Sequence, residues 1–232
     1  MTLPGPICGI LLAAAAACCA AQATPGFPAA DEKLEYTVNW PSGLSLGDGR
    51  LEARRAGDGW EFVFALDAAV PGFAVSDRYR AVVSGDLCAL EAEKDATHGR
   101  RRSREKTTFD YRRNVARRAT VGGGKTEIPI GGCARDALGF LFHLRRELGQ
   151  GRVPAPQTVL FGSSYQVRLE YAGAQAVSVN EKKQQADRMV VYLKGPGSDL
   201  NFEIFFSRDG SRTPLVVRVP FSMGTFSMEL AH

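Results

Sequence analysis

The chain has 232 residues, of which 44% are hydrophobic and 23% charged, which is ordinary for a globular protein. Its formal net charge of +4 is too small to indicate a polyanion partner by itself. The length suits one domain with a real core, and 25 glycines with 12 prolines favour a chain that turns often. We therefore expect a single β-rich domain over residues 31–232.

Residues 1–23 have the pattern of a secretory signal peptide. The first thirty residues carry no charged side chain, Ile10 to Ala17 form an apolar run, and Ala21-Gln22-Ala23 is a small-x-small cleavage site. The positively charged start of such peptides is missing, which leaves an uncleaved membrane anchor or a mis-assigned start as alternatives. The apolar run is too short to span a bilayer comfortably. We expect cleavage near Ala23, a short lead-in over residues 24–30, and a periplasmic or secreted protein.

The cysteines bear on the same question of compartment. Acylation of Cys18 or Cys19 would make the protein a lipoprotein, but alanine occupies the position three residues before each, where leucine is expected. Cleavage leaves Cys88 and Cys133, an even pair that indicates a disulfide in an exported protein. Closing a loop of about 46 residues would stabilise the fold by about 4 kcal/mol in the chain-entropy model. Two buried thiols are the alternative.

Apolar and polar residues alternate in many short segments, a period typical of half-buried strands. A hairpin is predicted to join residues 50–56 to 60–68 through the glycine-rich turn between them. In the last third, alternating runs with Gly173, residues 195–197 and residues 209–211 as turns predict an antiparallel meander; the runs are 167–171, 189–193, 202–206, 215–219 and 226–230. A flat sheet of so many strands would expose long edges. We therefore expect a mainly β fold, an antiparallel strongly curved sheet or open barrel.

One segment has the helical period instead. Leucines and phenylalanines recur at helical spacing over about residues 134–148, Arg145 and Arg146 lie in the last turns, and Gly149 suits a C-cap. We expect one amphipathic helix that closes a mouth of the curved sheet or packs on its concave face. A disulfide at Cys133 would tether its start to the sheet.

Arginines are concentrated between residues 100 and 118, with few acids among them. They could contact the phosphates of lipid headgroups or glycans, since arginine binds phosphate in a bidentate way. Nucleic acid is disfavoured as a ligand, because only two aromatic side chains on which bases could stack lie nearby and an exported protein leaves the compartment that holds nucleic acid. The alternative is a solvated hairpin with basic outward positions. The candidate anion-contacting residues are Arg100, Arg101, Arg102, Arg104, Arg112, Arg113, Arg117 and Arg118.

No motif identifies a reaction. The stretch 122–126, Gly-Gly-Gly-Lys-Thr, lacks the earlier glycine of a phosphate-binding loop and is better read as a hairpin turn. The three histidines lie far apart, so no metal site is expected. Residues 162–164, Gly-Ser-Ser, are the nearest approach to a serine nucleophile and suit a turn between strands. We expect no cofactor, and an enzyme less than a binding protein; the catalytic residues of any enzyme remain unknown.

Several segments resemble, in order, a bacterial family named domain of unknown function 3108. They are residues 31–40 (DEKLEYTVNW), 108–111 (TFDY), 136–145 (DALGFLFHLR), 212–215 (RTPL) and 224–230 (GTFSMEL). The resemblance covers about residues 31 to 230 and implies an exported, mainly β protein of the bacterial envelope. It implies no activity and no site residues.

Three hypotheses for function follow. The leading one is a non-catalytic binding or assembly module of the envelope, whose curved sheet and helix enclose an apolar groove for a lipid-like ligand or an envelope partner. The second is a basic surface scaffold that contacts anionic lipid or glycan. The third is a hydrolase with an unrecognised site.

Overall fold

A computed structural model describes residues 31–70, 72–196, 199–222 and 224–231, so the predicted signal peptide (1–23) and lead-in (24–30) lie outside the described residues. The described residues form fifteen strands and one helix, α1 (Ala137–Gly149). The strands are β1 (Glu32–Asn39), β2 (Ser45–Ala56), β3 (Gly59–Val70), β4 (Phe73–Val83), β5 (Ala89–His98), β6 (Arg101–Asp110), β7 (Val115–Thr120), β8 (Lys125–Pro129), β9 (Arg135–Asp136), β10 (Gln157–Phe161), β11 (Ser163–Val179), β12 (Lys182–Lys194), β13 (Asp199–Ser207), β14 (Pro214–Phe221) and β15 (Gly224–Leu230).

All fifteen strands belong to one sheet. Its order is β8-β7-β6-β5-β4-β3-β2-β1-β15-β14-β13-β12-β11-β10-β9, so the first and last strands of the chain pair at its middle. Every pairing is antiparallel except that of β9 with β10. The ends β8 and β9 do not pair with each other, so the sheet is open, and the predicted mainly β, antiparallel curved fold is confirmed.

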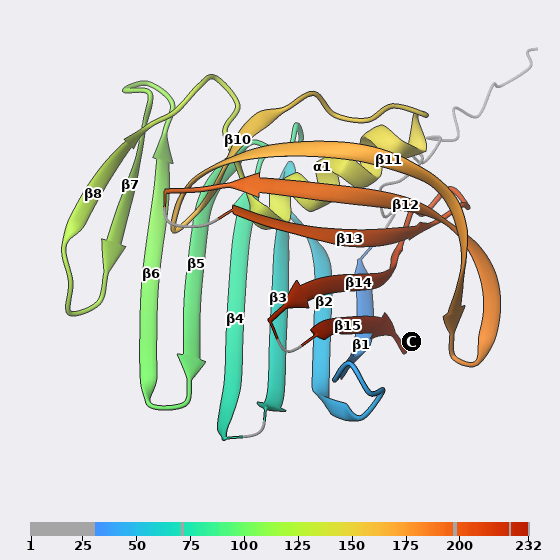
Figure 1. Cartoon of the computed structure of the whole chain (residues 1–232). Helices are drawn as coiled ribbons and strands as arrows, with labels where there is room; N and C mark the ends of the chain where they lie inside the picture. Colours follow the sequence, from blue (N-terminus) through green and yellow to red (C-terminus); the bar gives the residue numbers. More distant parts are fainter. Residues whose placement is uncertain (1–30, 71, 197–198, 223, 232) are drawn as a thin grey trace, which may run out of the picture.

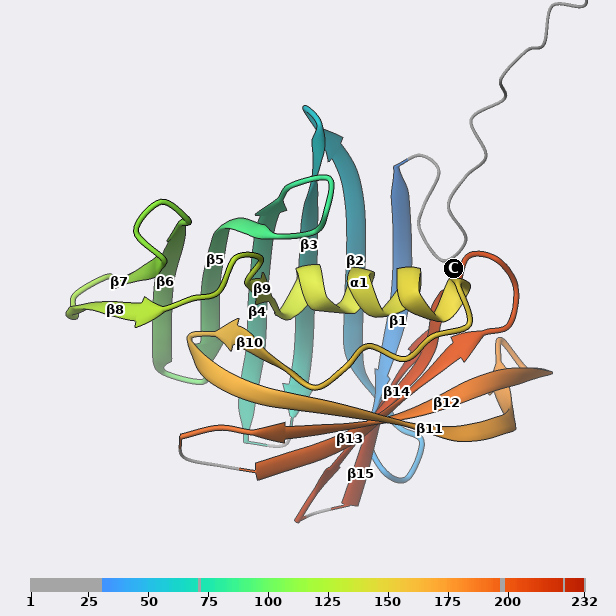
Figure 2. The same cartoon turned by 90° about the horizontal axis from the view of Figure 1, so that it is seen from above.

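The sheet folds over so that its two halves face each other across α1. Figures 1 and 2 show β1 to β8 as one wall, β10 to β15 as the other, and the helix between them. Phe142 of α1 stacks on Phe62 of the first wall, with ring centroids 3.8 Å apart. Phe140 and Leu144 pack with Met189 of the second wall. The helix is therefore part of the core, on the concave face of the sheet as predicted.

The bounds of α1 differ from the predicted 134–148. The helix begins at Ala137 because the Asp136 carboxylate accepts hydrogen bonds from the backbone N–H groups of Leu138 and Gly139, at 2.9 and 3.2 Å. A residue that caps in this way has an extended backbone, and Asp136 pairs with β10 instead. Gly149 still belongs to the helix, and the turn with positive φ falls at Gly151 (φ 73°).

The predicted hairpin is confirmed, since β2 and β3 pair from Gly47 with Ala68 to Ala56 with Gly59. The meander is confirmed as well, but the turn predicted at Gly173 is wrong. β11 runs through Gly173 (φ 86°) with a shift of register there, and the chain reverses at Asn180 and Glu181. A glycine with positive φ can kink a strand by a bulge without ending it.

Cys88 and Cys133 form a disulfide, with Cα atoms 4.8 Å apart. The backbone N–H of Ala89 also donates to the carbonyl of Ala134 at 2.8 Å. The segment that leads into α1 is thereby attached to the start of β5.

Candidate functional site

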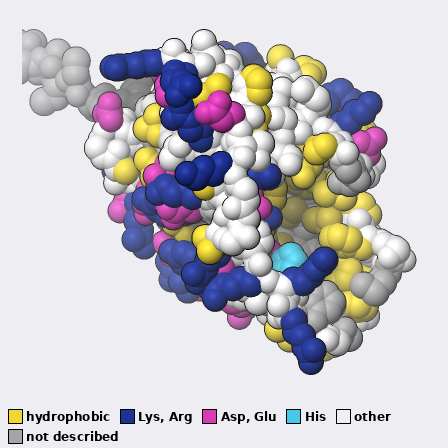
Figure 3. Space-filling view, turned by 90° about the vertical axis from the view of Figure 1, so that its left-hand side faces the viewer, with side chains coloured by type: hydrophobic (Ala, Val, Ile, Leu, Met, Phe, Trp, Pro, Cys, Tyr) yellow, Lys and Arg dark blue, Asp and Glu magenta, His cyan; other side chains and the backbone are white. Residues whose placement is uncertain are grey.

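The concave face leaves an apolar cavity at the end of the sheet away from α1. Its volume is about 510 Å³, and hydrophobic side chains line a hollow in the surface in Figure 3. Of the thirteen lining residues, only His98 and Ser227 carry polar side chains. The others are Val38, Leu46, Phe64, Leu66, Ala68, Val75, Val217, Val219, Phe221, Phe226 and Met228.

Strand alternation places these side chains. Phe62 packs on the helix, and the next two residues on the same face of β3, Phe64 and Leu66, lie progressively farther from it. Val217 and Val219 face them from β14 on the opposite wall. The helix fills one end of the space between the walls, and the other end stays open.

Aromatic rings cluster at the tip of the β14–β15 hairpin. The ring of Phe226 lies 5.3 Å from that of Phe221 and 4.8 Å from that of Trp40, both edge-on. Phe221 is 57% exposed although it lines the cavity. A large exposed aromatic at the mouth of an apolar hollow is typical of a binding surface.

His98, at the end of β5, is a polar residue of the cavity wall that contacts polar side chains of β4 behind it. His98 Nε2 lies 2.9 and 3.0 Å from the two carboxylate oxygens of Asp77, which is buried. The hydroxyl of Tyr79 donates to the same carboxylate at 3.2 Å. Burial, followed by the charge of Asp77, raises the pKa of Tyr79. The carboxylate is thus enclosed by its two partners, and the imidazole stands at the cavity edge.

A smaller cavity of about 230 Å³ lies on the other side of Phe64, beside Tyr79, Phe161 and Leu138. Asp136 lines it, and burial raises the pKa of this carboxyl group from 3.8 to about 6, against the lowering effect of its backbone hydrogen bonds. Because the Asp136 carboxylate caps α1, we assign Asp136 a structural role and not a role in ligand binding.

The arginines of residues 100–118 do not form one patch. Arg102 and Arg104 lie on the convex face and both bind Asp95, at 3.1 and 2.8 Å; the hydrogen bond from Arg102, followed by that from Arg104, lowers the pKa of Asp95. Arg117 binds Glu127 at 2.9 Å. Arg118 lies on the opposite face of its hairpin from Arg117, where it donates to the carbonyl of Gly162.

Four arginines of the run have exposed side chains with no ion pair among the described residues. Arg100 and Arg101 lie at the β5–β6 turn, whereas Arg112 and Arg113 lie at the β6–β7 turn. These turns are at opposite ends of β6, so the structure brings the arginines together only in pairs.

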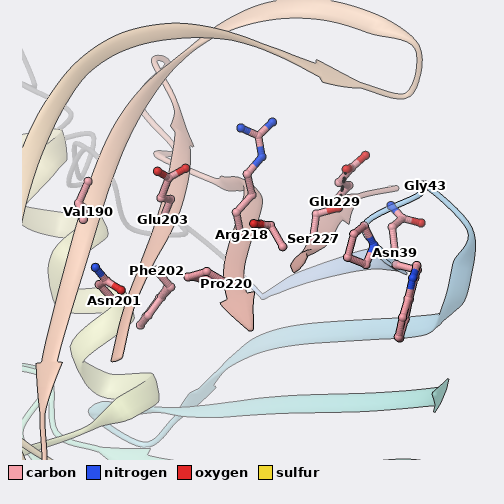
Figure 4. A pocket seen from close by; sticks show the side chains of 13 residues that line it. Asn39, Gly43, Val190, Asn201, Phe202, Glu203, Arg218, Pro220, Ser227 and Glu229 are labelled. Atoms are coloured by element: carbon pink, nitrogen blue, oxygen red, sulfur yellow. Dashed lines mark hydrogen bonds between the residues drawn. The ribbon is translucent and has the colours of Figure 1, made fainter. Parts of the chain in front are cut away.

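A groove of about 670 Å³ crosses the outer face of the second wall. Glu203, Arg218 and Glu229 point into it from neighbouring strands (Figure 4). Each of these charges has a protein partner: Glu203 binds Arg188, Glu229 accepts from the Ser227 hydroxyl at 2.8 Å, and Arg218 lies 4.7 Å from the Phe205 ring. Only Glu203 has an ion-pair partner among the described residues, so Arg218 and Glu229 leave the groove one unpaired charge of each sign and no net preference for an anion or a cation.

The two segments considered for catalysis or phosphate binding in the sequence form turns between strands. Residues 122–124 turn between β7 and β8, and Gly162 (φ 70°) turns between β10 and β11. Within the described ranges, no three histidine, cysteine or acidic side chains are grouped to hold a metal ion. The helix in this part of the chain is also not long and apolar enough to cross a membrane.

Sequence reasoning did not single out Asp77, Tyr79 or the wall contributed by β4. The signal was present in part, because Val75, Tyr79 and Ala81 share one face of the strand pattern with Asp77, whereas Ser76, Arg78 and Arg80 occupy the other face. A carboxylate such as that of Asp77, predicted on the buried face of a strand, needs hydrogen-bonding or ion-pair partners nearby.

Comparison with solved structures supports the fold alone. A β-barrel-like protein of domain of unknown function DUF1849 from Brucella abortus superposes with a TM-score of 0.61 at 11% sequence identity, over 87% of this chain and 96% of that chain. No curated protein matches the chain.

A family model does match most of the sequence. It is described as protein of unknown function, DUF3108, and it aligns with residues 35–231. The match agrees with the five sequence segments that resemble this family in the same order along the chain. The chain belongs to the DUF3108 family.

Proposed function

We propose that this protein is a non-catalytic binding module of the cell envelope that holds the acyl chain of a lipid-like ligand in the apolar cavity. The observation that carries the proposal is the cavity lining, in which eleven of thirteen side chains are hydrophobic. Its volume of about 510 Å³ lies within the usual range for small-molecule sites, roughly 300–1,000 Å³.

The location in the envelope is part of the proposal. Disulfides persist in oxidising compartments such as the periplasm, and the Cys88–Cys133 bond suits such a place. The apolar leader of the sequence provides a route for export. Fractionation of cells that make the full chain, with mass measurement of the mature protein, tests both the location and the cleavage near Ala23.

The binding test uses the neutral fluorescent probe N-phenyl-1-naphthylamine, which brightens in apolar sites. We expect the wild-type protein to bind it and Val219→Trp to bind it at least about tenfold more weakly, because the larger ring occupies the cavity. Thr225→Trp is the matched control, since Thr225 is exposed and lines the outer groove instead.

Native mass spectrometry of protein purified gently from the envelope complements this assay, and a retained lipid-like mass would support the proposal. A wild-type protein that leaves the probe dark, or an equal loss of binding in both tryptophan variants, would contradict it.

The alternative of a basic surface scaffold has weaker support. Arg102, Arg104 and Arg117 already have acidic partners, and the unpaired arginines lie in two separate turns. No observation on the described residues favours a hydrolase.

A further inference from the structure

The rim of the apolar cavity carries one guanidinium, that of Arg101, with no acid partner among the described residues, beside the imidazole of His98, which contacts Asp77. His98 is the last residue of β5 and faces Arg101, the first residue of β6, across the hairpin. Directly opposite residues of an antiparallel pair project from the same face of the sheet. Because His98 lines the cavity, Arg101 stands on the cavity side of the sheet as well.

Arg101 is available to a ligand. Its side chain is exposed, and no carboxylate of the described residues lies within ion-pair distance of it. Asp77, an acid on this face, contacts the imidazole of His98 and the hydroxyl of Tyr79. Figure 3 shows a histidine and basic side chains at the border of the hydrophobic hollow.

The contact with Asp77 orients the imidazole. With Nε2 donating to the buried carboxylate, Nδ1 is the ring atom left for a ligand at the rim, and it can donate to an anion when the ring is in its imidazolium form. A guanidinium beside it supplies several N–H donors in a fork that suits the oxygens of a carboxylate or phosphate. An apolar cavity with such a rim fits a molecule that has an apolar tail and an anionic head.

We propose that the ligand is an anionic amphiphile, whose tail lies in the cavity and whose carboxylate or phosphate head is bound by Arg101 and His98. This inference rests on the proposed function, since it requires that the cavity binds an acyl chain. It adds the chemical class of the head group and two residues that recognise it.

The experiment compares three compounds with the same sixteen-carbon tail for displacement of N-phenyl-1-naphthylamine: palmitate, hexadecyl phosphate and hexadecanol. We expect at least one anion to displace the probe at a concentration about tenfold lower than hexadecanol does, as a charge-assisted hydrogen bond would give. Whether palmitate or the phosphate binds more tightly identifies the source of the head group.

Variants locate the effect. Arg101→Gln is expected to weaken binding of the anions far more than binding of hexadecanol and so to remove the preference, and His98→Gln to reduce the preference. Arg102→Gln is the matched control, because it removes the same charge one residue away on the convex face and leaves Arg104 with Asp95. It should keep the preference. Thermal unfolding of each variant verifies that it folds.

The outcomes separate the two proposals. Equal displacement by all three compounds, or equal loss of preference in Arg101→Gln and Arg102→Gln, would overturn the head-group assignment and leave acyl-chain binding intact. Failure of every compound, together with failure of the probe itself to bind the wild-type protein, would overturn both.

Discussion

At the residue scale, one arginine links three parts of the chain that are distant in sequence. Arg145 of α1 is fully buried, with its guanidinium paired to Glu32 of β1 at 2.6 and 2.9 Å. It also donates to the carbonyl of Ser211, in the β13–β14 connection, and lies 5.0 Å from the Phe142 ring. The sequence predicts Arg145 only as a cation near the helix end, because burial by other strands leaves no mark in the helix itself.

Replacing Arg145 with methionine tests this interpretation. We expect Arg145→Met to lower the free energy of unfolding by about 3–5 kcal/mol, because Glu32 then keeps its charge without its partner in a largely buried place. Arg146→Met, one residue along, should cost less than about 1 kcal/mol. Urea unfolding measures both, and a similar small loss in each would show that the buried pair is not important for stability.

Asp136 is a second residue whose burial has a measurable consequence. Its carboxyl group has a pKa raised by burial from 3.8 to about 6, so the folded state binds this proton more tightly than the unfolded state does. The stability that the protonated form contributes is complete below about pH 3.8 and is lost as the pH rises to about 6.

Asp136→Asn isolates this effect, because the asparagine oxygen can still cap α1 but does not titrate. Between pH 4 and 7, wild-type stability should fall relative to the variant by on the order of 2–3 kcal/mol. Unfolding curves recorded over this pH range measure the difference. A wild type that gains stability relative to the variant as the pH rises would mean that the backbone hydrogen bonds outweigh burial.

At the scale of elements, α1 depends on attachments at its start as much as on its apolar faces. Gly139 lies so close to β4 that an added Cβ would be 3.2 Å from Val83 Cγ1. Cys133 and Ala134, just before the helix, are held to Cys88 and Ala89 by the disulfide and a backbone hydrogen bond. The sequence predicts a helix here, but its depth between the walls follows from these contacts.

The double variant Cys88→Ala/Cys133→Ala tests the contribution of the disulfide. Opening a loop of 45 residues in sequence separation should reduce the free energy of unfolding by about 4 kcal/mol, mainly because the unfolded chain regains entropy. Denaturant unfolding measures the loss. Wild-type protein treated with a reductant is the control, and equal stability of the oxidised and double-variant proteins would exclude this role.

At the scale of the whole molecule, the open sheet and the single helix create the cavity together. The two walls diverge from the pairing of β1 with β15, and α1 covers only one end of the space between them (Figure 2). At that end Trp60, Phe62 and Phe142 are fully buried. At the other end Phe221 remains exposed, because no described helix covers that part of the sheet. An unfilled apolar space is therefore a property of the topology.

The sequence by itself determined the local features. Alternation along each strand, the helical spacing in α1 and the glycine turn between β2 and β3 depend on neighbouring residues, so they predicted the mainly β class, the helix and the hairpin. The turn at Gly173 was misplaced because the pairing of β11 with β12 decides where a bulge falls. The start of α1 was misplaced because residues 135 and 136 pair with β10.

Only the tertiary structure decided which side chains meet. Phe64 and Val217 line one cavity although they belong to opposite walls, and Arg101 and Arg102 are neighbours in sequence yet face opposite sides of the sheet. The run of arginines looked like one surface in the sequence, but the period of two in β6 and the turns at its ends divide it. Long-range pairing sets these contacts, and no short stretch of the chain encodes it.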